Sequence, residues 1–335
     1  MKQGSNWLKT GILVAGLLFG SWSSVPVQAA EGTVDSYTAQ LAANPEDEAA
    51  YCARGKAYFT AQRYDLSLAD FSKAIELNPQ DAKAYNGRGL VYGKLAQNDL
   101  ALADYNKAIE LDAKYAEAYD NRGNFYVSHA QYALAFTDFD QALSLNAQDE
   151  AAYLGRGMLY MVAQKYDLAA ADFTQAIALS PQDVVLYNQR GAAYAAGSKT
   201  DLALADYAQA LQLDAYDATT YNNRAMLYMK QKQYPAAVAD YTQAIKVNPD
   251  YLQAYVNRAY VYVVTEKYDL AVADYDQALR INPKLADVYY YKARSCEKLG
   301  RKADAAAAYQ EFVQRVPASD SLAADAQQRL NALQG

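Results

Sequence analysis

The segment EAAYLGRGMLYMVAQKYDLAAADFTQAIALSPQD, from Glu150 to Asp183, has a pattern that returns every 34 residues. Copies aligned on Tyr153 follow one another without insertion, so the chain contains eight contiguous units. They span residues 48–81, 82–115, 116–149, 150–183, 184–217, 218–251, 252–285 and 286–319. A fixed period of this size is typical of a stacked repeat architecture, in which each unit packs on its neighbours.

Each unit carries the periodicity of two helices. Tyr153, Gly157 and Tyr160 fall on one face of a first helix, and Ala169 and Phe173 on one face of a second. Asp residues mark the helix starts, because Asp is a preferred N-cap. The expected N-caps of first helices are Asp81, Asp149, Asp183 and Asp217, and those of second helices are Asp65, Asp99, Asp167, Asp201 and Asp269. Each unit is therefore predicted to be a helix hairpin.

The residues at seven positions of the unit resemble the tetratricopeptide repeat (TPR): an aromatic at position 4, Gly at 8, Tyr at 11, Ala at 20, Phe or Tyr at 24, Ala at 27 and Pro at 32. This resemblance covers residues 48–319 and implies an all-α fold, a right-handed superhelical solenoid of helix hairpins. Residues 31–47 match half a unit and predict an N-terminal capping helix. Residues 320–335 predict a C-terminal capping helix, with Asp325, Gln328 and Arg329 on its outer face.

The first 29 residues lie outside the repeat. Lys2 and Lys9 precede an apolar run from Gly11 to Gly20, and small residues around Ala29 suit a cleavage site, as in a secretory signal peptide. An uncleaved membrane anchor is the competing interpretation, but the run is short of the roughly 20 residues that span a bilayer. We therefore expect an exported protein, periplasmic, secreted or at the cell surface, with membrane contact only if the segment is not cleaved.

The charge balance disfavours nucleic acid as a partner. The chain has a formal net charge of −7 and no basic stripe along its repeats, whereas binding to a phosphate backbone requires one. Cys52 and Cys296 lie in the first and last units, too far apart for a disulfide, and are predicted to be free thiols.

Two charged series are unusual for the family. Arg or Lys occupies position 7 of every unit and Asp occupies position 23 of the first seven, and the eighth unit lacks both the Arg and the Asp. We predict ion pairs between neighbouring helices, with the guanidinium packed over a Tyr. The competing interpretation is a charged recognition surface. The basic series is Arg54, Arg88, Arg122, Arg156, Arg190, Arg224, Arg258 and Lys292, and the acidic series is Asp70, Asp104, Asp138, Asp172, Asp206, Asp240 and Asp274.

Nothing in the sequence predicts an active site. The single histidine, His129, is expected on the surface near the end of a first helix. The Cys and His residues lack metal-ligand spacing, and the chain has no Gly-rich phosphate loop and no nucleophile elbow. The sequence is that of a non-enzyme without a predicted cofactor or metal.

Resemblance to the family implies that positions 2, 5, 6, 9, 12 and 13 of the first helices face a bound partner. The Lys and Asn set with which co-chaperones of the family hold a C-terminal carboxylate is absent here. Position 6 instead resembles the asparagine ladder of O-GlcNAc transferase, whose amides hold a peptide backbone. The residues concerned are Asn121, Gln189, Asn223 and Asn257, with the adaptable Met158 and Met226 at position 9. Alternatively, these amides only solvate an open helix face.

An aromatic patch is predicted at the C-terminal end of this groove. Tyr260 is at position 9 of the seventh unit, and Tyr290 and Tyr291 are at positions 5 and 6 of the eighth, with Asn257 and Arg294 alongside. Such patches concentrate binding energy. The alternative is that these tyrosines cover apolar surface at the end of the stack.

The sequence as a whole favours an exported scaffold that binds an extended peptide or a partner protein in the concave groove. The alternative is a cell-envelope component that binds polysaccharide or peptidoglycan through exposed Tyr. The identity of the partner and the oligomeric state do not follow from the sequence.

Overall fold

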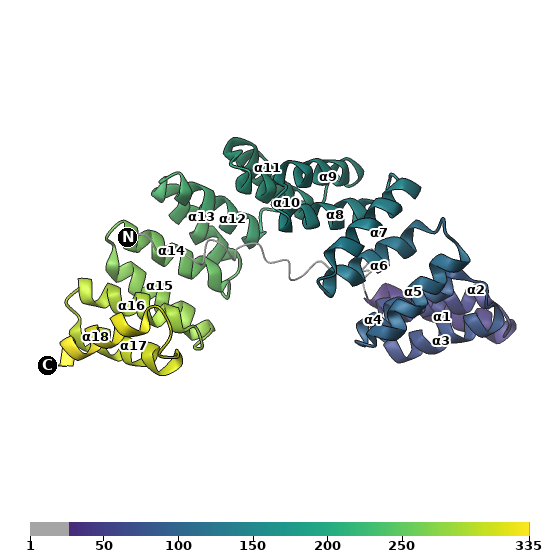
Figure 1. The fold of residues 1–335 in the computed structure, drawn as a ribbon, viewed down its shortest axis with the longest axis horizontal. Coiled ribbons are helices and arrows are strands. Elements are labelled where there is room, and N and C mark those ends of the chain that lie inside the picture. Colours follow the sequence, from purple (N-terminus) through teal and green to yellow (C-terminus); the bar gives the residue numbers. More distant parts are fainter. Residues whose placement is uncertain (1–26, 335) are drawn as a thin grey trace. The chain divides into compact units, whose positions relative to one another are not determined.

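The computed structural model describes residues 27–334, which form 18 helices and no strand, packed as consecutive hairpins (Figure 1). The predicted signal peptide lies outside these residues, apart from its last three, where α1 begins. The chain divides after Pro181 into two compact parts. No helix of the described residues is long and apolar enough to cross a membrane.

The first part contains α1 (Val27–Ala43), α2 (Glu48–Thr60), α3 (Tyr64–Leu77), α4 (Ala82–Lys94), α5 (Asn98–Leu111), α6 (Ala116–Ser128), α7 (Tyr132–Leu145), α8 (Glu150–Val162) and α9 (Tyr166–Leu179). The second contains α10 (Val184–Ala196), α11 (Thr200–Leu213), α12 (Ala218–Lys230), α13 (Tyr234–Val247), α14 (Leu252–Val264), α15 (Tyr268–Ile281), α16 (Ala286–Lys298), α17 (Lys302–Arg315) and α18 (Ala323–Gln334). The first helices of the hairpins thus begin at the first residues of the 34-residue units.

The core of each hairpin is built on the aromatic residue at position 24. Phe139 is fully buried, and its ring lies against Gly123 of its own hairpin and Gly155 of the next. A Cβ atom would come within 2.9 Å of the ring at Gly123 and within 2.5 Å at Gly155. A side chain at either site would therefore force the Phe139 ring to shift.

The helix starts confirm four of the nine expected N-caps, all on first helices. Asp81, Asp149, Asp183 and Asp217 each accept a hydrogen bond from a backbone N–H in the first turn of a first helix. The second-helix prediction is wrong by two residues, because the N-cap of α3, for example, is Arg63 and not Asp65. These helices begin at position 17, and Asp65, Asp99, Asp167, Asp201 and Asp269 lie inside the first turn. There their charge still favours the helix, through the dipole at its N-terminus.

The turn inside every hairpin has the same hydrogen bonds. Arg63 N–H donates to Tyr58 C=O at 2.8 Å, and Gln62 between them has a φ of 58°. This is a Schellman C-cap, which usually places glycine at the left-handed residue. The equivalent residues in the other hairpins are Ala96, Ala130, Gln164, Ser198, Lys232, Glu266 and Gly300. Seven of the eight turns therefore adopt this conformation without glycine.

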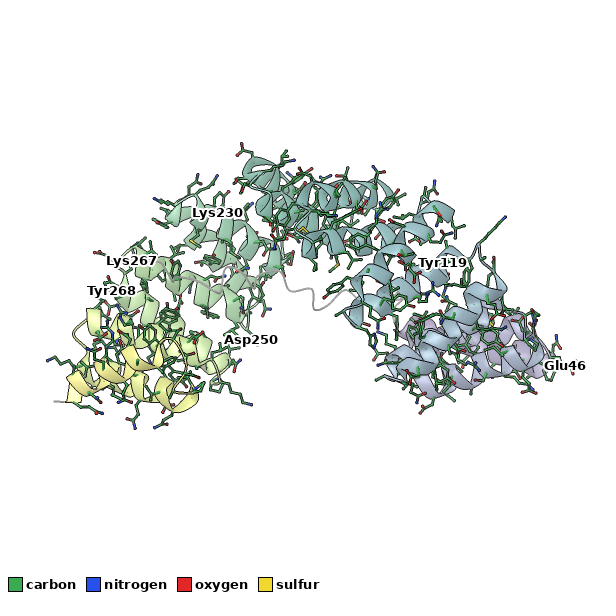
Figure 2. All side chains as sticks on the ribbon, viewed as in Figure 1. Glu46, Tyr119, Lys230, Asp250, Lys267 and Tyr268 are labelled. Carbon is green, nitrogen blue, oxygen red and sulfur yellow. The ribbon has the colours of Figure 1, made fainter. Side chains whose placement is uncertain are left out.

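The predicted ion pairs are confirmed in all seven units that carry both residues. Arg156 Nε and Nη2 donate to the two carboxylate oxygens of Asp172, each at 2.8 Å, and so join the two helices of one hairpin. The third nitrogen, Nη1, donates to Asp140 of the preceding hairpin at 2.8 Å. Asp172 is buried, with 6% exposure. The guanidinium also lies over tyrosines of its own helix, as Arg122 does over Tyr119, which Figure 2 labels.

Both ends of the stack carry a helix. Val34 and Leu41 of α1 are buried, and Ala326 and Leu330 of α18 pack into the core of the last hairpin. Charged side chains at the helix ends and turns, including Glu46, Lys230 and Asp250, are exposed (Figure 2). The expectation that Asp325 and Arg329 face outward is wrong, because both are half-buried and bonded to α16.

Candidate functional site

Two of the four amides predicted at position 6, Asn121 and Asn257, bond to the preceding hairpin. Asn121 Nδ2 donates to Asn86 Oδ1 at 3.1 Å, and Asn257 Nδ2 donates to Asn222 Oδ1 at 3.0 Å. Asn121 is buried, with 4% exposure, so the expectation that it meets a peptide backbone is wrong. The alternative, simple solvation, is wrong for Asn121 as well. These bonds join one first helix to the next.

The remaining amides and the methionines are unequally exposed. Gln189, Asn223 and Asn257 are half-buried and so reach the surface. Met226 is also half-buried, and its Sδ accepts a hydrogen bond from Asn222 Nδ2 at 3.7 Å. Met158 is buried, with 8% exposure, and it is not available to a partner.

The aromatic patch is split between surface and core. Tyr260 is 42% exposed and Tyr291 is half-buried, whereas Tyr290 is only 5% exposed. The Tyr290 ring packs against Phe312 at a centroid distance of 5.4 Å, in the cluster that also takes in α18. The prediction that Tyr290 forms part of an exposed patch is therefore wrong, and the structural alternative holds for this residue.

Tyr260 and Tyr291 remain as the surface part of the patch. Burial raises the pKa of the Tyr291 hydroxyl, and Asp287 and the hydroxyls of Tyr290 and Tyr260 raise it further. The Tyr260 hydroxyl, on the preceding first helix, is thus close enough to Tyr291 to affect its ionisation. Val264, one turn after Tyr260 on α14, is 41% exposed. Together they present an apolar surface on positions 6, 9 and 13.

Arg294 belongs to a polar network under the C-terminal helix. Its Nη1 donates to the Tyr290 hydroxyl at 3.1 Å, and that hydroxyl donates to Asp325 at 2.7 Å. Arg329 donates to Asp325 at 2.7 Å and to Glu297 at 3.1 Å. Arg294 is half-buried, so it borders the surface patch while it also holds α18 in place.

Comparison with known families agrees with the repeating hairpins. A family model described as "Tetratricopeptide repeat" matches residues 82–115 and 218–251, and another of the same description matches residues 121–184, 154–218 and 261–320. A third, described as "TPR repeat", matches residues 55–95. The chain belongs to the tetratricopeptide repeat family. No curated protein matches it.

Solved TPR structures share the fold. The C-terminal part of a TPR repeat-containing protein from Cytophaga hutchinsonii is 19% identical, with a TM-score of 0.56 over 70% of this chain and 96% of that one. Pseudomonas aeruginosa pilF is 19% identical, with a TM-score of 0.55 over 64% and 98%. YrrB, described as a TPR protein with an unusual peptide-binding site, is 29% identical, with a TM-score of 0.49 over 55% and 95%.

The sequence does not predict one cluster of potential metal ligands in this TPR chain. Oxygens of Glu48 and Asp81 and the sulfur of Cys52 all lie within 4.8 Å of one another, the only such group among residues 32–334. A hydrogen bond with Asp81, together with burial, raises the pKa of Glu48 to about 7. Glu48 and Cys52 are one turn apart on α2, but only the fold brings Asp81 to them. Both cysteines are free thiols, as predicted.

A second cluster lies at groove positions of the third TPR unit. Asp120, at position 5 of α6, is 4% exposed, and its Oδ1 is a buried oxygen without a hydrogen-bond partner. Burial raises its pKa well above the usual range, and Asp149 and Glu117 raise it further. Sequence analysis missed this cluster because Asp149 was assigned only an N-cap role.

Proposed function

We propose that this protein is an exported scaffold that binds an extended segment of a partner protein along the first helices of its hairpins. TPR proteins are generally non-enzymatic scaffolds and typically bind proteins or peptides. The observation that carries the proposal is the pair of large apolar side chains, Tyr260 and Val264, exposed one turn apart on α14. An exposed apolar surface with a polar rim is typical of a protein-binding site.

The distribution of exposed tyrosines favours a protein over a polysaccharide. Among the 32 tyrosines only Tyr132, Tyr216 and Tyr260 are exposed, and they lie on α7, in the turn before α12 and on α14. A sugar chain stacks on aromatic rings that are presented together, and these three come from separate elements. Protein or peptide is therefore the proposed partner class.

Export of the protein follows from the first 29 residues of the sequence and is tested separately. The mature N-terminus can be determined by mass spectrometry of the protein secreted or released from the periplasm of a host cell. A chain that begins near Ala30 supports the proposal, and an intact Met1 in the cytoplasmic fraction contradicts it.

Binding is tested with Tyr260→Ala and Tyr290→Ala as a matched pair. Each variant, as the full chain, is used in a pull-down from the native envelope, and its melting temperature is measured. We expect Tyr260→Ala to lose the captured partner, at a cost of about 2 kcal/mol or more in affinity, and to melt like the wild type. Tyr290→Ala should melt earlier. Capture of the partner unchanged by Tyr260→Ala would exclude this surface.

A further inference from the structure

Position 5 of a first helix has a recurring partner, which is the side chain 29 residues further along the chain. In the first, second and fifth units this partner contains an acceptor, and position 5 contains a donor. The pairs are Cys52 with Asp81 at 3.4 Å, Asn86 with the Tyr115 hydroxyl at 3.2 Å, and Asn188 with Asp217 at 2.8 Å. In these three units the side chain at position 5 is thus the donor of a polar link to the start of the next hairpin.

The third unit lacks this donor. Its position 5 is Asp120, and the residue 29 positions later is Asp149, so two acids face each other. Asp120 Oδ2 accepts a hydrogen bond from Asn124 at 3.2 Å, but Oδ1 has no partner. A buried polar atom without a partner destabilises the fold, because it has lost its hydrogen bonds to water and gained none in return. The site is therefore short of one donor.

A third acid adds to the same electrostatic environment. Glu117 lies one turn before Asp120 on α6, and its Oε2 accepts a hydrogen bond from the Tyr115 hydroxyl at 3.2 Å. Glu117 and Asp149 are half-buried and reach the surface, whereas Asp120 is the buried member. Burial, backed by Glu117, also raises the pKa of Asp149. The charges that act on Asp120 are thus both negative.

We propose that Glu117, Asp120 and Asp149 form a binding site for a lysine or arginine side chain of the partner segment. This inference rests on the proposed function, because Glu117 and Asp120 occupy groove positions 2 and 5. A cationic head group placed between Glu117 and Asp149 supplies the donors that the site lacks, and its charge offsets that of Asp120. The net charge of −7 also favours a basic segment.

An organic cation fits this cluster better than a metal ion does. Ligand atoms around a metal lie close together, and among residues 32–334 only Glu48, Cys52 and Asp81 bring three such atoms within 4.8 Å. The oxygens of Glu117, Asp120 and Asp149 are more widely spaced. An ammonium or guanidinium group carries several N–H donors and can bridge carboxylates at larger separations.

The test uses Nα-acetyl-lysinamide as the probe and Nα-acetyl-norleucinamide as its uncharged control. The full-length protein is labelled with ¹³C at the Asp and Glu carboxyl carbons and titrated by NMR. We expect the lysine probe to shift the Asp120 and Asp149 signals saturably, and the norleucine probe to leave them in place. Binding should weaken about tenfold or more in Asp120→Asn and in Asp149→Asn, because each replaces a carboxyl group that can carry a negative charge beside the bound cation by a neutral amide.

The choice of asparagine keeps both variants folded. The amide introduced by Asp120→Asn would donate to Asp149 as Asn188 does to Asp217. The side-chain oxygen that remains in Asp149→Asn retains the N-cap of α8, because asparagine caps a helix about as well as aspartate does. Asp183→Asn changes an Asp at the same position of the next unit and should leave the lysine titration unaltered.

Several outcomes would overturn the assignment. Equal shifts with both probes, no site-specific shift, or full affinity in both Asn variants would each exclude a cation site. These outcomes are independent of the pull-down with Tyr260→Ala, which tests the proposed function. Unchanged capture by Tyr260→Ala together with a saturable lysine titration would exclude the proposed groove surface and leave the cation site in place.

Discussion

The Tyr290 hydroxyl donates a 2.7 Å hydrogen bond to Asp325, the residue 35 positions further along the chain. The same 35-residue separation links Asn86 to Asn121 and Asn222 to Asn257. Position 5 of each of these first helices therefore meets position 6 of the next one. The last helix, α18, thus occupies the register of a ninth first helix, although its sequence no longer carries the repeat pattern.

Removal of this contact should loosen the C-terminal end alone. Tyr290→Phe keeps the ring in its cluster and deletes the hydroxyl that donates to Asp325 and accepts from Arg294, and each hydrogen bond to a charged group is worth about 1.5 to 3 kcal/mol. Hydrogen exchange of α18 amides should accelerate about tenfold or more, while amides of α6 keep their protection, because distant repeats share no contacts. Tyr289→Phe is the control, since its hydroxyl makes only an exposed 3.4 Å contact. Faster exchange across the whole chain would contradict this prediction.

The ion pair between Arg156 and Asp172 should show strong coupling in a double-mutant cycle. Either Arg156→Leu or Asp172→Ala leaves a largely buried partner charge without its bidentate contact, at a cost of about 3 kcal/mol. The double variant should lose less than the sum of the two, as measured by urea unfolding. The exposed pair Lys107 and Glu110 is the control, and its coupling should stay below about 0.5 kcal/mol. Additive losses at Arg156 and Asp172 would argue against pairing.

Gly155→Ala should destabilise the interface between the third and fourth hairpins. The new methyl group would lie 2.5 Å from Phe139 Cζ, and such overpacking costs about 1 to 3 kcal/mol. Gly93→Ala, where the closest atom is the Tyr105 hydroxyl at 3.8 Å, should be neutral or gain up to about 1 kcal/mol from helix propensity. Thermal unfolding of both variants checks this prediction, and equal melting temperatures would refute it.

Stability should fall as the pH rises, because of Asp120. Burial raises the pKa of Asp120 in the folded protein, and Asp149 and Glu117 raise it further, so the folded state holds a proton that the unfolded state releases above about pH 4. The resulting stabilisation is complete below that pH and is lost as the pH rises through the folded-state pKa. Asp120→Asn lacks this dependence, so its advantage in melting temperature over the wild type should grow between about pH 4 and pH 8. A constant difference would show that Asp120 is ionised in the fold.

The sequence was sufficient for features that repeat and insufficient for features that occur once. The hairpins, the first-helix caps and the pairs such as Arg156 with Asp172 follow from patterns present in nearly every unit. The predicted start of the second helix is displaced by two residues, because the true N-cap at position 16 is Arg, Gln or Lys, none of which is a preferred capping residue.

Features that occur only once depend on contacts that the 34-residue period does not predict. Burial of Tyr290 requires the register of α18, which packing sets after the repeat pattern has ended. The environment of Asp120 requires knowing that position 5 meets the residue 29 positions later, a relation that emerged only from bonds such as Asn188 to Asp217. The same applies to the groove amides. The sequence predicts that Asn121 meets a ligand, because its hydrogen bond to Asn86 of the preceding hairpin follows only from the fold.

The backbone conformation of the hairpin turns does not depend on which amino acid occupies the position with positive φ. Because Gln62, Ala96, Ala130 and Gln164 adopt the same left-handed conformation, the packing of the two helices imposes it on whichever residue is present. An L-residue in this conformation costs roughly 1 to 2 kcal/mol, which the hairpin tolerates in seven copies. Each turn is therefore a site where side chains can be exchanged freely, and evolution can vary one edge of every repeat without altering the stack.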